Sequence, residues 1–444
     1  MLTEKLTEDS AERVGGPDDA VDRPASVRAG SSKVRRIEEL DGLRAVAILL
    51  VISCHYPGFC VLLGGFLKFG WVGVEIFFAI SGYLITTILL GLRTKPSPYT
   101  TFYARRTIRI LPVYLVVTVL LIPGIHYEHI LQPRWYLFDQ VFFLRGFTDP
   151  FWSLMANLFR HPLRSLLHLA PLSTGRALYY DNSVPRMFFT GAAYVSWSLS
   201  VEEFFYLLWA PVVLKLSRRW VTITAFVVCA GALLLRWLLC AGLASYFWTA
   251  CRFDGLMYGA LVALVIESAR QRQQLNRLFW ACLGGSILGL AGIWIYLRPV
   301  LNHDPRTSLL FLTFGLSLTG IATASIVGIL VTQAGRRWLV GDVLRWRMLV
   351  FVGTISYTMY LVHVAIATLI GGLPIGALGR ACLALGLTIA VAYASWNWLE
   401  LPLLQWKDKR FPNSPHPSEP VLSGFSERSS LSRETARTSA GSRS

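Results

Sequence analysis

Long apolar segments recur along most of this chain, and no other feature constrains its fold as strongly. A helix needs about 20 residues to cross the hydrocarbon core of a bilayer, and about ten segments reach that length. They lie near residues 41–63, 69–91, 108–125, 197–215, 220–240, 250–268, 277–297, 308–332, 348–370 and 376–401. Because single spans in lipid must be helical to satisfy their own backbone hydrogen bonds, the pattern predicts an all-α, polytopic integral membrane protein with about ten transmembrane helices.

Composition and charge agree with a membrane protein and argue against other classes. Charged residues make up 15% of the sequence, whereas soluble domains carry roughly a quarter. The formal net charge of +16 would suggest nucleic acid in a soluble protein, but no basic helix or RNA-binding signature accompanies it. We therefore expect the lipid bilayer as the partner of these charges, and no nucleic acid. The seven cysteines form no CxxC pairs, and no HExxH motif occurs, so no metal site is expected.

The distribution of Lys and Arg predicts the orientation of the segments. Loops rich in these residues alternate with loops that hold few, and cytoplasmic loops carry the excess. The basic residues of the rich loops are Arg93, Lys95, Arg105, Arg106, Lys215, Arg218, Arg219, Arg270, Arg272, Arg277, Arg336, Arg337, Arg345 and Arg347. We therefore expect a multi-pass protein of the cell inner (plasma) membrane with both termini in the cytoplasm.

Three stretches lie outside the apolar segments. Residues 1–36 and 403–444 are polar and lack apolar periodicity, which predicts disordered cytoplasmic tails around a transmembrane domain over residues 37–402. The connection over about 126–196 is long, aromatic and extracytoplasmic. It is either a belt lying on the headgroups or a lid that binds the acceptor. For the segment as a whole we favour a functional role, because long loops are usually functional or disordered, and this one is too aromatic for disorder.

Ionisable side chains inside the predicted spans are the strongest local signals of function, because burying each of them costs several kcal/mol. At a rise of 1.5 Å per residue, Glu202 would lie about 9 Å below the outer face of the membrane. The residues expected in this outer layer are His55, Glu75, Glu202, Arg252, Asp254 and His363. The residues expected in a second layer at the inner face are Arg44, Arg106, Arg109 and Glu400.

Arg44 and His55 connect the two layers along one span. They are eleven residues apart, which is about three full helical turns, so both side chains point the same way. One helix face would then present a cation near the cytoplasm and an imidazole farther up. This geometry predicts a path from an anionic cytoplasmic donor to an acceptor on the outer side.

Several short motifs occur in a fixed order on these spans. They are Arg44 with His55 after ten intervening residues, the segment 70–84, the RxxR of Arg106 and Arg109, the segment 196–206, Arg252-Phe-Asp254, the segment from Ser356 through Tyr360 to His363, and Glu400-Leu-Pro402. Together they resemble the membrane-bound acyltransferase family 3, bacterial O-acyltransferases of surface glycans and secondary metabolites. The resemblance covers residues 37–402, and Glu75 stands where the family often has Asp.

The resemblance implies an O-acyltransferase, which transfers groups other than aminoacyl groups. The expected co-substrate is cytoplasmic acyl-CoA, most simply acetyl-CoA, with no bound cofactor. The expected acceptor is a hydroxyl of a surface or lipid-linked glycan, a glycolipid or a small hydroxylated molecule. Many members carry a fused extracytoplasmic SGNH esterase-like domain, and this chain resembles the stand-alone form.

Acyl transfer to a hydroxyl needs a base, and we assign His55 to that role because its ordinary pKa is near 6.5. Glu202 would orient or polarise His55, as the third group of a triad does. The alternative for His55 is a hydrogen-bonded structural histidine. The alternative for Glu202 is an ion pair with Arg252 or another basic residue.

Three arginines would hold the phosphates of acyl-CoA at the inner face: Arg44, Arg106 and Arg109. The planar guanidinium binds phosphate through two donors and stays charged. The alternative is topology alone, because basic residues at cytoplasmic helix ends are ordinary.

The sequence allows two different roles for each of two further residues, Ser81 and Glu400. Ser81 is a candidate nucleophile, but Ser81-Gly82 also suggests small-residue helix packing, so we expect direct transfer. Glu400 with Pro402 either pairs with Arg44 or simply marks a helix end stopped by proline.

Two other functions fit the same intramembrane charges. A transporter or flippase of a glycan or lipid-linked substrate would use charges and a broken helix in a similar way. A membrane partner of a glycan assembly complex would use the charges structurally. The sequence also leaves the oligomeric state open, and a homo-oligomer is among the expected states.

Overall fold

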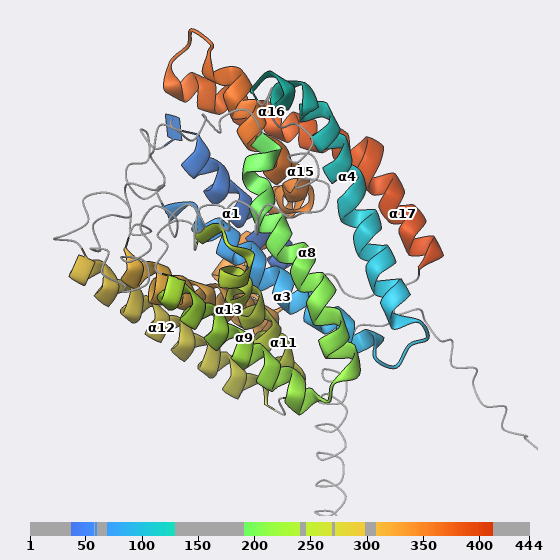
Figure 1. Ribbon diagram of the computed structural model, residues 1–444, viewed down its shortest axis with the longest axis vertical. Helices are drawn as coiled ribbons and strands as arrows, with labels where there is room; N and C mark the ends of the chain where they lie inside the picture. Colours follow the sequence, from blue (N-terminus) through green and yellow to red (C-terminus); the bar gives the residue numbers. More distant parts are fainter. Residues whose placement is uncertain are drawn as a thin grey trace, which may run out of the picture. The chain divides into compact units, whose positions relative to one another are not determined.

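The computed structural model describes residues 37–56, 58–59, 69–128, 191–239, 246–268, 271–297 and 308–411. In these ranges the regular elements are helices (Figure 1). The α-helices are α1 (Glu38–His55), α3 (Val72–Leu92), α4 (Pro98–Glu128), α8 (Gly191–Lys215), α9 (Arg218–Leu239), α11 (Phe253–Ser268), α12 (Arg272–Leu297), α13 (Leu316–Gln333), α14 (Leu339–Leu344), α15 (Arg347–Gly371), α16 (Ala377–Ser395) and α17 (Leu401–Arg410). A 3₁₀ turn, η3 (Thr249–Arg252), precedes α11, and two π-helical turns, η5 (Phe311–Gly315) and η6 (Trp396–Glu400), precede α13 and α17.

Eight helices in the described part of the chain are long and apolar enough to cross a membrane. They are Val72–Leu92, Val195–Lys215, Arg218–Leu238, Thr249–Ser268, Arg272–Leu297, Phe311–Gln333, Arg347–Gly371 and Ala377–Arg410. The other two predicted spans fall on α1 and α4, which are not among these eight. The prediction of an all-α, polytopic membrane fold is confirmed.

The helix α3 lies at the centre of the helices that carry the site. It packs against α1, α4, α8, α11 and α13. The approach to α11 is close because small residues face each other there. A Cβ added at Gly82 would collide with the carbonyl oxygen of Leu256, and one at Gly259 would collide with that of Ala79. Such small-residue contacts are how membrane helices gain packing energy without a hydrophobic driving force.

A second close contact joins α1 to α15. A Cβ at Gly353 would collide with the backbone carbonyl of Asp41, so only glycine permits this approach. The two helices stay in contact along their lengths. As a result, the far end of α1, where His55 lies, meets the part of α15 that carries His363.

The first of the predicted spans is interrupted after His55. Helix α1 ends at His55, and Tyr56 is extended (φ −107°, ψ 96°). Its N–H still bonds to the carbonyl of Ile52. His55 is therefore the last helical residue of α1, where the chain leaves the helix axis.

Arginines join the helix ends of the basic loops to one another. Each donates to carbonyl oxygens in the last turn of a neighbouring helix or just after it, which satisfies groups that a helix end leaves unpaired. These bonds run from Arg93 to Val213 (2.8 Å) and Leu216 (3.0 Å), from Arg218 to Leu264 (2.6 Å) and from Arg272 to Val331 (2.8 Å). The loops rich in Lys and Arg, which the sequence placed on one side of the membrane, are thus linked to neighbouring helix ends by these hydrogen bonds.

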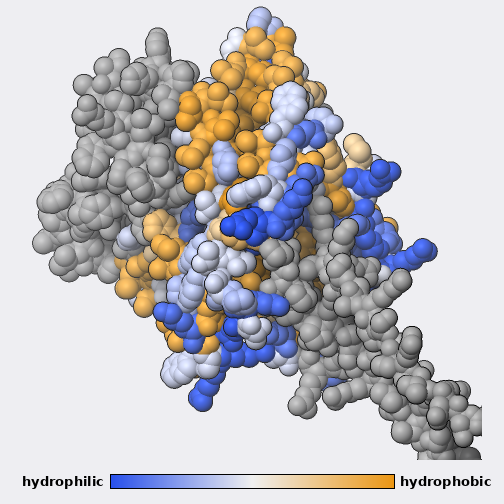
Figure 2. Space-filling model, turned by 90° about the vertical axis from the view of Figure 1, so that its right-hand side faces the viewer, coloured by the Kyte–Doolittle hydropathy of each residue, from blue (hydrophilic) through white to orange (hydrophobic). Residues whose placement is uncertain are grey.

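Apolar side chains face outward on the surface of α4 and α16, where lipid would lie. The exposed ones include Val116, Val119, Leu120, Leu383 and Leu387. Figure 2 shows this side of the molecule, with hydrophobic residues gathered in its upper part and hydrophilic residues below. This separation suits a protein whose middle is embedded in a bilayer.

The C-terminal end of the described chain differs from its predicted boundary. Helix α17 continues to Arg410, past the position 402 at which a disordered tail was expected to begin. It packs on α4, where Arg105 pairs with Asp408 at 2.7 Å. The remainder of that tail lies outside the described residues, as do the predicted N-terminal tail and most of the segment 126–196.

Candidate active site

Two histidines from distant parts of the sequence meet at one end of α1. The ring centroids of His55 and His363 are 5.0 Å apart, with one ring edge-on to the other at 74°. His55 is half-buried, and His363 is fully buried, with 0% of its surface exposed. The sequence placed both in an outer layer, and the structure brings them together.

The proton positions of both rings follow from their hydrogen bonds. Nδ1 of His55 lies 2.8 Å from the carbonyl oxygen of Val51, and Nδ1 of His363 lies 2.7 Å from that of Tyr360. A carbonyl oxygen only accepts, so Nδ1 carries the proton in each ring. In the neutral form the lone pair that acts as a base is therefore on Nε2 in both histidines.

Hydroxyl groups hold the backbone around His363. The hydroxyl of Tyr56 donates to the carbonyl oxygen of His363 at 3.1 Å and lies 2.9 Å from Thr388 Oγ1. The hydroxyls of Ser198 and Tyr360 are 2.6 Å apart. Helices α1, α8, α15 and α16 thus meet around the histidine pair, which fixes its position.

Glu202 lies in a different group from the histidines. Its carboxylate accepts hydrogen bonds from Ser81 (3.0 Å) and Tyr206 (2.7 Å). The positive charges of Arg106 and Arg44 also act on it. Glu202 therefore belongs to the inner layer, and the expectation that it orients His55 is wrong.

The sequence misjudged the position of Glu202 because α8 begins earlier than expected. The sequence placed the beginning of this span near residue 196, whereas the helix begins at Gly191. Glu202 is thus about 16 Å along α8 from its first residue, deeper than the roughly 9 Å that the sequence suggested. The alternative pairing of Glu202 with Arg252 is also wrong, because Arg252 pairs with Glu75.

The inner layer contains the predicted arginines. Arg44 pairs with Asp41 at 2.9 Å on α1. The guanidinium of Arg106 lies over the rings of Phe102 (6.0 Å) and Tyr206 (5.5 Å), and makes no ion pair with any described residue. Arg109 lies one turn farther along α4 and is exposed. Arg106 and Arg44 are close enough to influence each other electrostatically.

Ser81 and Glu400 both have defined partners. Ser81 donates to Glu202, and its neighbour Gly82 makes the close contact with α11. Glu400 ends the π-helical turn η6, where its carboxylate accepts from Thr358 (2.7 Å) and Ser395 (3.3 Å). These partners, rather than Arg44, hold Glu400, and the chain continues as the helix α17 through Pro402, so neither of the two interpretations of Glu400 is confirmed.

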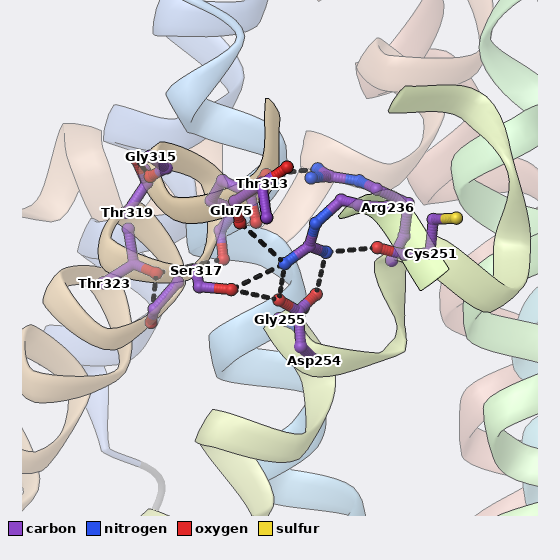
Figure 3. Close-up of polar contacts among 12 residues, drawn as sticks. Glu75, Arg236, Cys251, Asp254, Gly255, Thr313, Gly315, Ser317, Thr319 and Thr323 are labelled. Atoms are coloured by element: carbon purple, nitrogen blue, oxygen red, sulfur yellow. Dashed lines mark hydrogen bonds and ion pairs between the residues drawn. The ribbon is translucent and has the colours of Figure 1, made fainter. Parts of the chain in front are cut away.

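A separate network of charges lies among α3, α9, α11 and α13 (Figure 3). Glu75 pairs with Arg252, and Asp254 is bound through both carboxylate oxygens by Arg236, at 3.0 and 2.7 Å. Ser317 donates to Asp254 at 3.0 Å and accepts from Arg236 at 2.6 Å. The network holds two positive and two negative side chains, so its charges balance.

Aromatic rings surround one of these pairs. The guanidinium of Arg252 lies 4.7 Å from the ring centroid of Tyr246, 5.7 Å from that of Phe78 and 5.8 Å from that of Trp197. Glu75, Arg252 and Asp254 were all expected in the outer layer, and the structure places them together. Glu75 and Arg252 bind each other and Asp254 binds Arg236, and none of the three bonds to a histidine among the described residues.

Arg236 is the member of this network that the sequence analysis missed. It is fully buried and lies within the apolar run of α9. An arginine inside a predicted span is a signal that the sequence does contain. Its partner Asp254 lies 18 residues later, on α11, and no local motif joins the two, so only the fold shows that they form a pair. The described residues contain no group of three His, Cys, Asp or Glu side chains that could hold a metal.

Comparison with known families decides what kind of site this is. The acyltransferase domain family (Acyl_transf_3) matches residues 37–397, which include α1, both histidines and the inner arginines. The chain belongs to this family. An acyltransferase domain is consistent with a basic imidazole at one end of α1 and arginines at the other, and it favours an enzyme over a transporter.

Curated relatives include cell-wall enzymes. The chain is 27% identical to the peptidoglycan O-acetyltransferase OatA of Listeria monocytogenes over 402 residues, covering 83% of this chain and 56% of that protein. It is 25% identical to the O-acetyltransferase OatA of Staphylococcus aureus over 399 residues, covering 85% and 58%. The chain thus spans little more than half the length of these relatives. No solved structure matches it.

Proposed function

We propose that this protein is a membrane O-acetyltransferase that moves an acetyl group from cytoplasmic acetyl-CoA to a hydroxyl of a cell-envelope glycan. The proposal rests on membership of the acyltransferase family and on relatives named as O-acetyltransferases, one of them of peptidoglycan. Such a transfer also requires a base near the acceptor and an anion-binding group for coenzyme A at a different level of the membrane.

The observation that carries the proposal is the placement of both functions on α1. Arg44 and His55 lie on one unbroken helix, about 16 Å apart along its axis and on the same face. Arg44 is near Arg106, and His55 is beside His363. Phosphates held at the arginines would leave the long pantetheine arm of coenzyme A free to extend toward the imidazole.

At the end of α1 that carries Arg44, the nearby guanidinium of Arg106 suits phosphate, whereas Arg44 itself is paired with Asp41. Arg106 is held by aromatic rings instead of carboxylates. The nearby carboxylate of Glu202 takes its hydrogen bonds from hydroxyls. Guanidinium groups that are not neutralised by carboxylates retain the paired donors that phosphate requires.

The reaction balances with this chain's groups. Nε2 of His55 removes the proton from the acceptor hydroxyl as the oxygen attacks the thioester carbonyl. A new C–O bond forms, the C–S bond breaks, and the electron pair leaves on the coenzyme A sulfur. The proton held by His55 then returns to that thiolate or to solvent, which regenerates the neutral base. No acyl-enzyme intermediate is needed.

The orientation belongs to the same proposal. The loops joined by Arg93, Arg218 and Arg272 would face the cytoplasm, since they carry the Lys and Arg excess. Both termini would then be cytoplasmic in the inner membrane. The His55 end of α1 would approach the outer face, where a glycan acceptor is found.

The test is a search for base-labile O-acetyl groups on purified peptidoglycan and other envelope glycans by mass spectrometry. It compares cells that lack the protein with cells that express, at equal level, the wild type, His55→Ala or Cys282→Ala. We expect an ester that depends on the wild type, is lost in His55→Ala and is kept in Cys282→Ala, a half-buried residue of α12. If no ester depends on the protein, the proposed function is wrong.

A further inference from the structure

His363 has an unusual position for a buried polar group. Its ring is fully buried, yet Nε2 has no hydrogen-bond partner among the described residues. Leaving a buried acceptor without a donor carries the full cost of taking that acceptor out of water. Such a group is retained where a partner arrives during function, and that partner must supply a donor.

His55 cannot be that partner in the resting state. Both rings carry their proton on Nδ1, where each bonds to a backbone carbonyl. Both Nε2 atoms are then acceptors, and two acceptors cannot bond to each other. The two rings therefore do not bond to each other through Nε2, although their centroids are only 5.0 Å apart.

The rest of the cluster keeps His363 from turning to another partner. Its Nδ1–H is held by Tyr360, and its backbone carbonyl is held by the hydroxyl of Tyr56. The ring of Tyr360 lies 5.7 Å from that of His363. Tyr360 is buried like His363, whereas the neighbouring ring of His55 is only half-buried. A donor for His363 would therefore enter beside His55.

We propose that His363 Nε2 accepts a hydrogen bond from a second hydroxyl of the acceptor, while His55 takes the proton of the reacting hydroxyl. This inference rests on the proposed function. Sugars suit such a pair because adjacent carbons carry hydroxyls a few ångströms apart, each of which is a donor. The acceptor is thus a polyhydroxylated molecule that contacts both His55 and His363 through two of its hydroxyls. His363 orients the sugar, and it does not transfer the proton.

The kinetic test uses the full chain in proteoliposomes with acetyl-CoA and chitotetraose, a soluble glycan probe. His363→Phe keeps a ring but removes the lone pair, and His363→Gln restores an acceptor. We expect His363→Phe to raise the KM for chitotetraose at least tenfold, with a smaller change in kcat and no change in the KM for acetyl-CoA. His363→Gln should recover part of the loss.

Tyr56→Phe is the matched control, since it loosens the backbone of His363 and leaves both imidazoles intact. A purely structural His363 would make the Phe, Gln and control variants alike, with changes in kcat and thermal stability rather than in the acceptor KM. That result, or a His363→Phe variant with wild-type kinetics, would overturn the inference.

A spectroscopic arm works on the wild type and does not depend on a variant that folds poorly. In protein labelled with ¹⁵N-histidine, the unprotonated Nε2 signal of His363 should shift when chitotetraose is added with coenzyme A. An unchanged signal would also overturn the inference. If the wild type transfers no acetyl group, the proposed function itself fails, and the two failures are therefore distinguishable.

Discussion

Two sets of buried polar side chains in this protein use the same residue types in different ways. In the network of Glu75, Arg252, Asp254 and Arg236, each carboxylate is bound directly by a guanidinium. In the inner layer of the site, the carboxylate of Glu202 is bound by hydroxyls. The arginine nearest to it is held by aromatic rings.

The difference separates holding helices together from binding a substrate. A buried ion pair with matched charges satisfies its own members, and its removal harms the fold. The guanidinium of Arg106, which makes no ion pair with a described residue, and the buried Nε2 of His363, which has no donor there, can instead meet a ligand. Both kinds of residue look alike in the sequence, where each is an ionisable residue inside an apolar run.

The comparison is tested most strongly by breaking one pair of the network. Arg236→Met leaves Asp254 buried without its counter-ion, which should cost about 3–5 kcal/mol of folding stability. Combining it with Asp254→Leu should recover most of that loss, because two apolar side chains replace the pair. Thermal unfolding in detergent measures both. A stable Arg236→Met protein without transferase activity would instead place this network in the active site.

The second prediction concerns the base. His55→Ala should lower acetyl transfer by roughly 10²–10⁴-fold, the usual contribution of a general base. The melting temperature should change little, because His55 is half-buried at the end of α1. Activity and melting temperature measured on the same preparation separate the two effects. Residual transfer near the wild-type rate would remove His55 from the reaction.

A smaller effect on activity is expected where acetyl-CoA would bind. Arg105 and Arg106 are adjacent in the sequence, so one serves as the control for the other. Arg106→Ala should raise the KM for acetyl-CoA by roughly 10–100-fold, since a hydrogen bond to a charged group contributes about 1.5–3 kcal/mol. Arg105→Ala breaks the contact with Asp408 on α17 and should leave that KM unchanged. Equal effects of the two variants would show that general basic charge, and not Arg106 itself, binds the donor.

The smallest effect is expected for an ion pair outside the membrane-spanning helices. Arg345 lies between α14 and α15 and pairs with Glu39 at 2.7 Å. Its hydrogen bond to Asp342 raises the pKa of Arg345, so the pair stays ionised around neutral pH. Arg345 is partly exposed, and the buried carboxylate of Glu39 keeps the N–H of Gly335 as a donor at 3.1 Å, so Arg345→Ala should cost only about 1 kcal/mol, less than Arg236→Met. A loss as large as that of Arg236→Met would mean that burial does not distinguish the two pairs.

The sequence predicted much of the site but not its grouping. His55 and His363 were both placed in an outer layer, and Arg44 and Arg106 at the inner face, because helix rise converts residue number into depth. Glu202 was misplaced because the first turn of α8 was not recognised as helical. Arg236 was overlooked, since no local motif contains it.

The sequence by itself determined the all-α membrane fold, because apolar segments of spanning length leave few other structures in lipid. It also determined that Arg44 and His55 share a face of one helix, because helical periodicity is local. Only the tertiary structure decided the partners: His55 with His363, Asp254 with Arg236, and Glu202 with Ser81. Those partners depend on contacts between helices far apart in the chain, such as the close approach at Gly353 and Gly82, and helical periodicity alone cannot specify which helices meet.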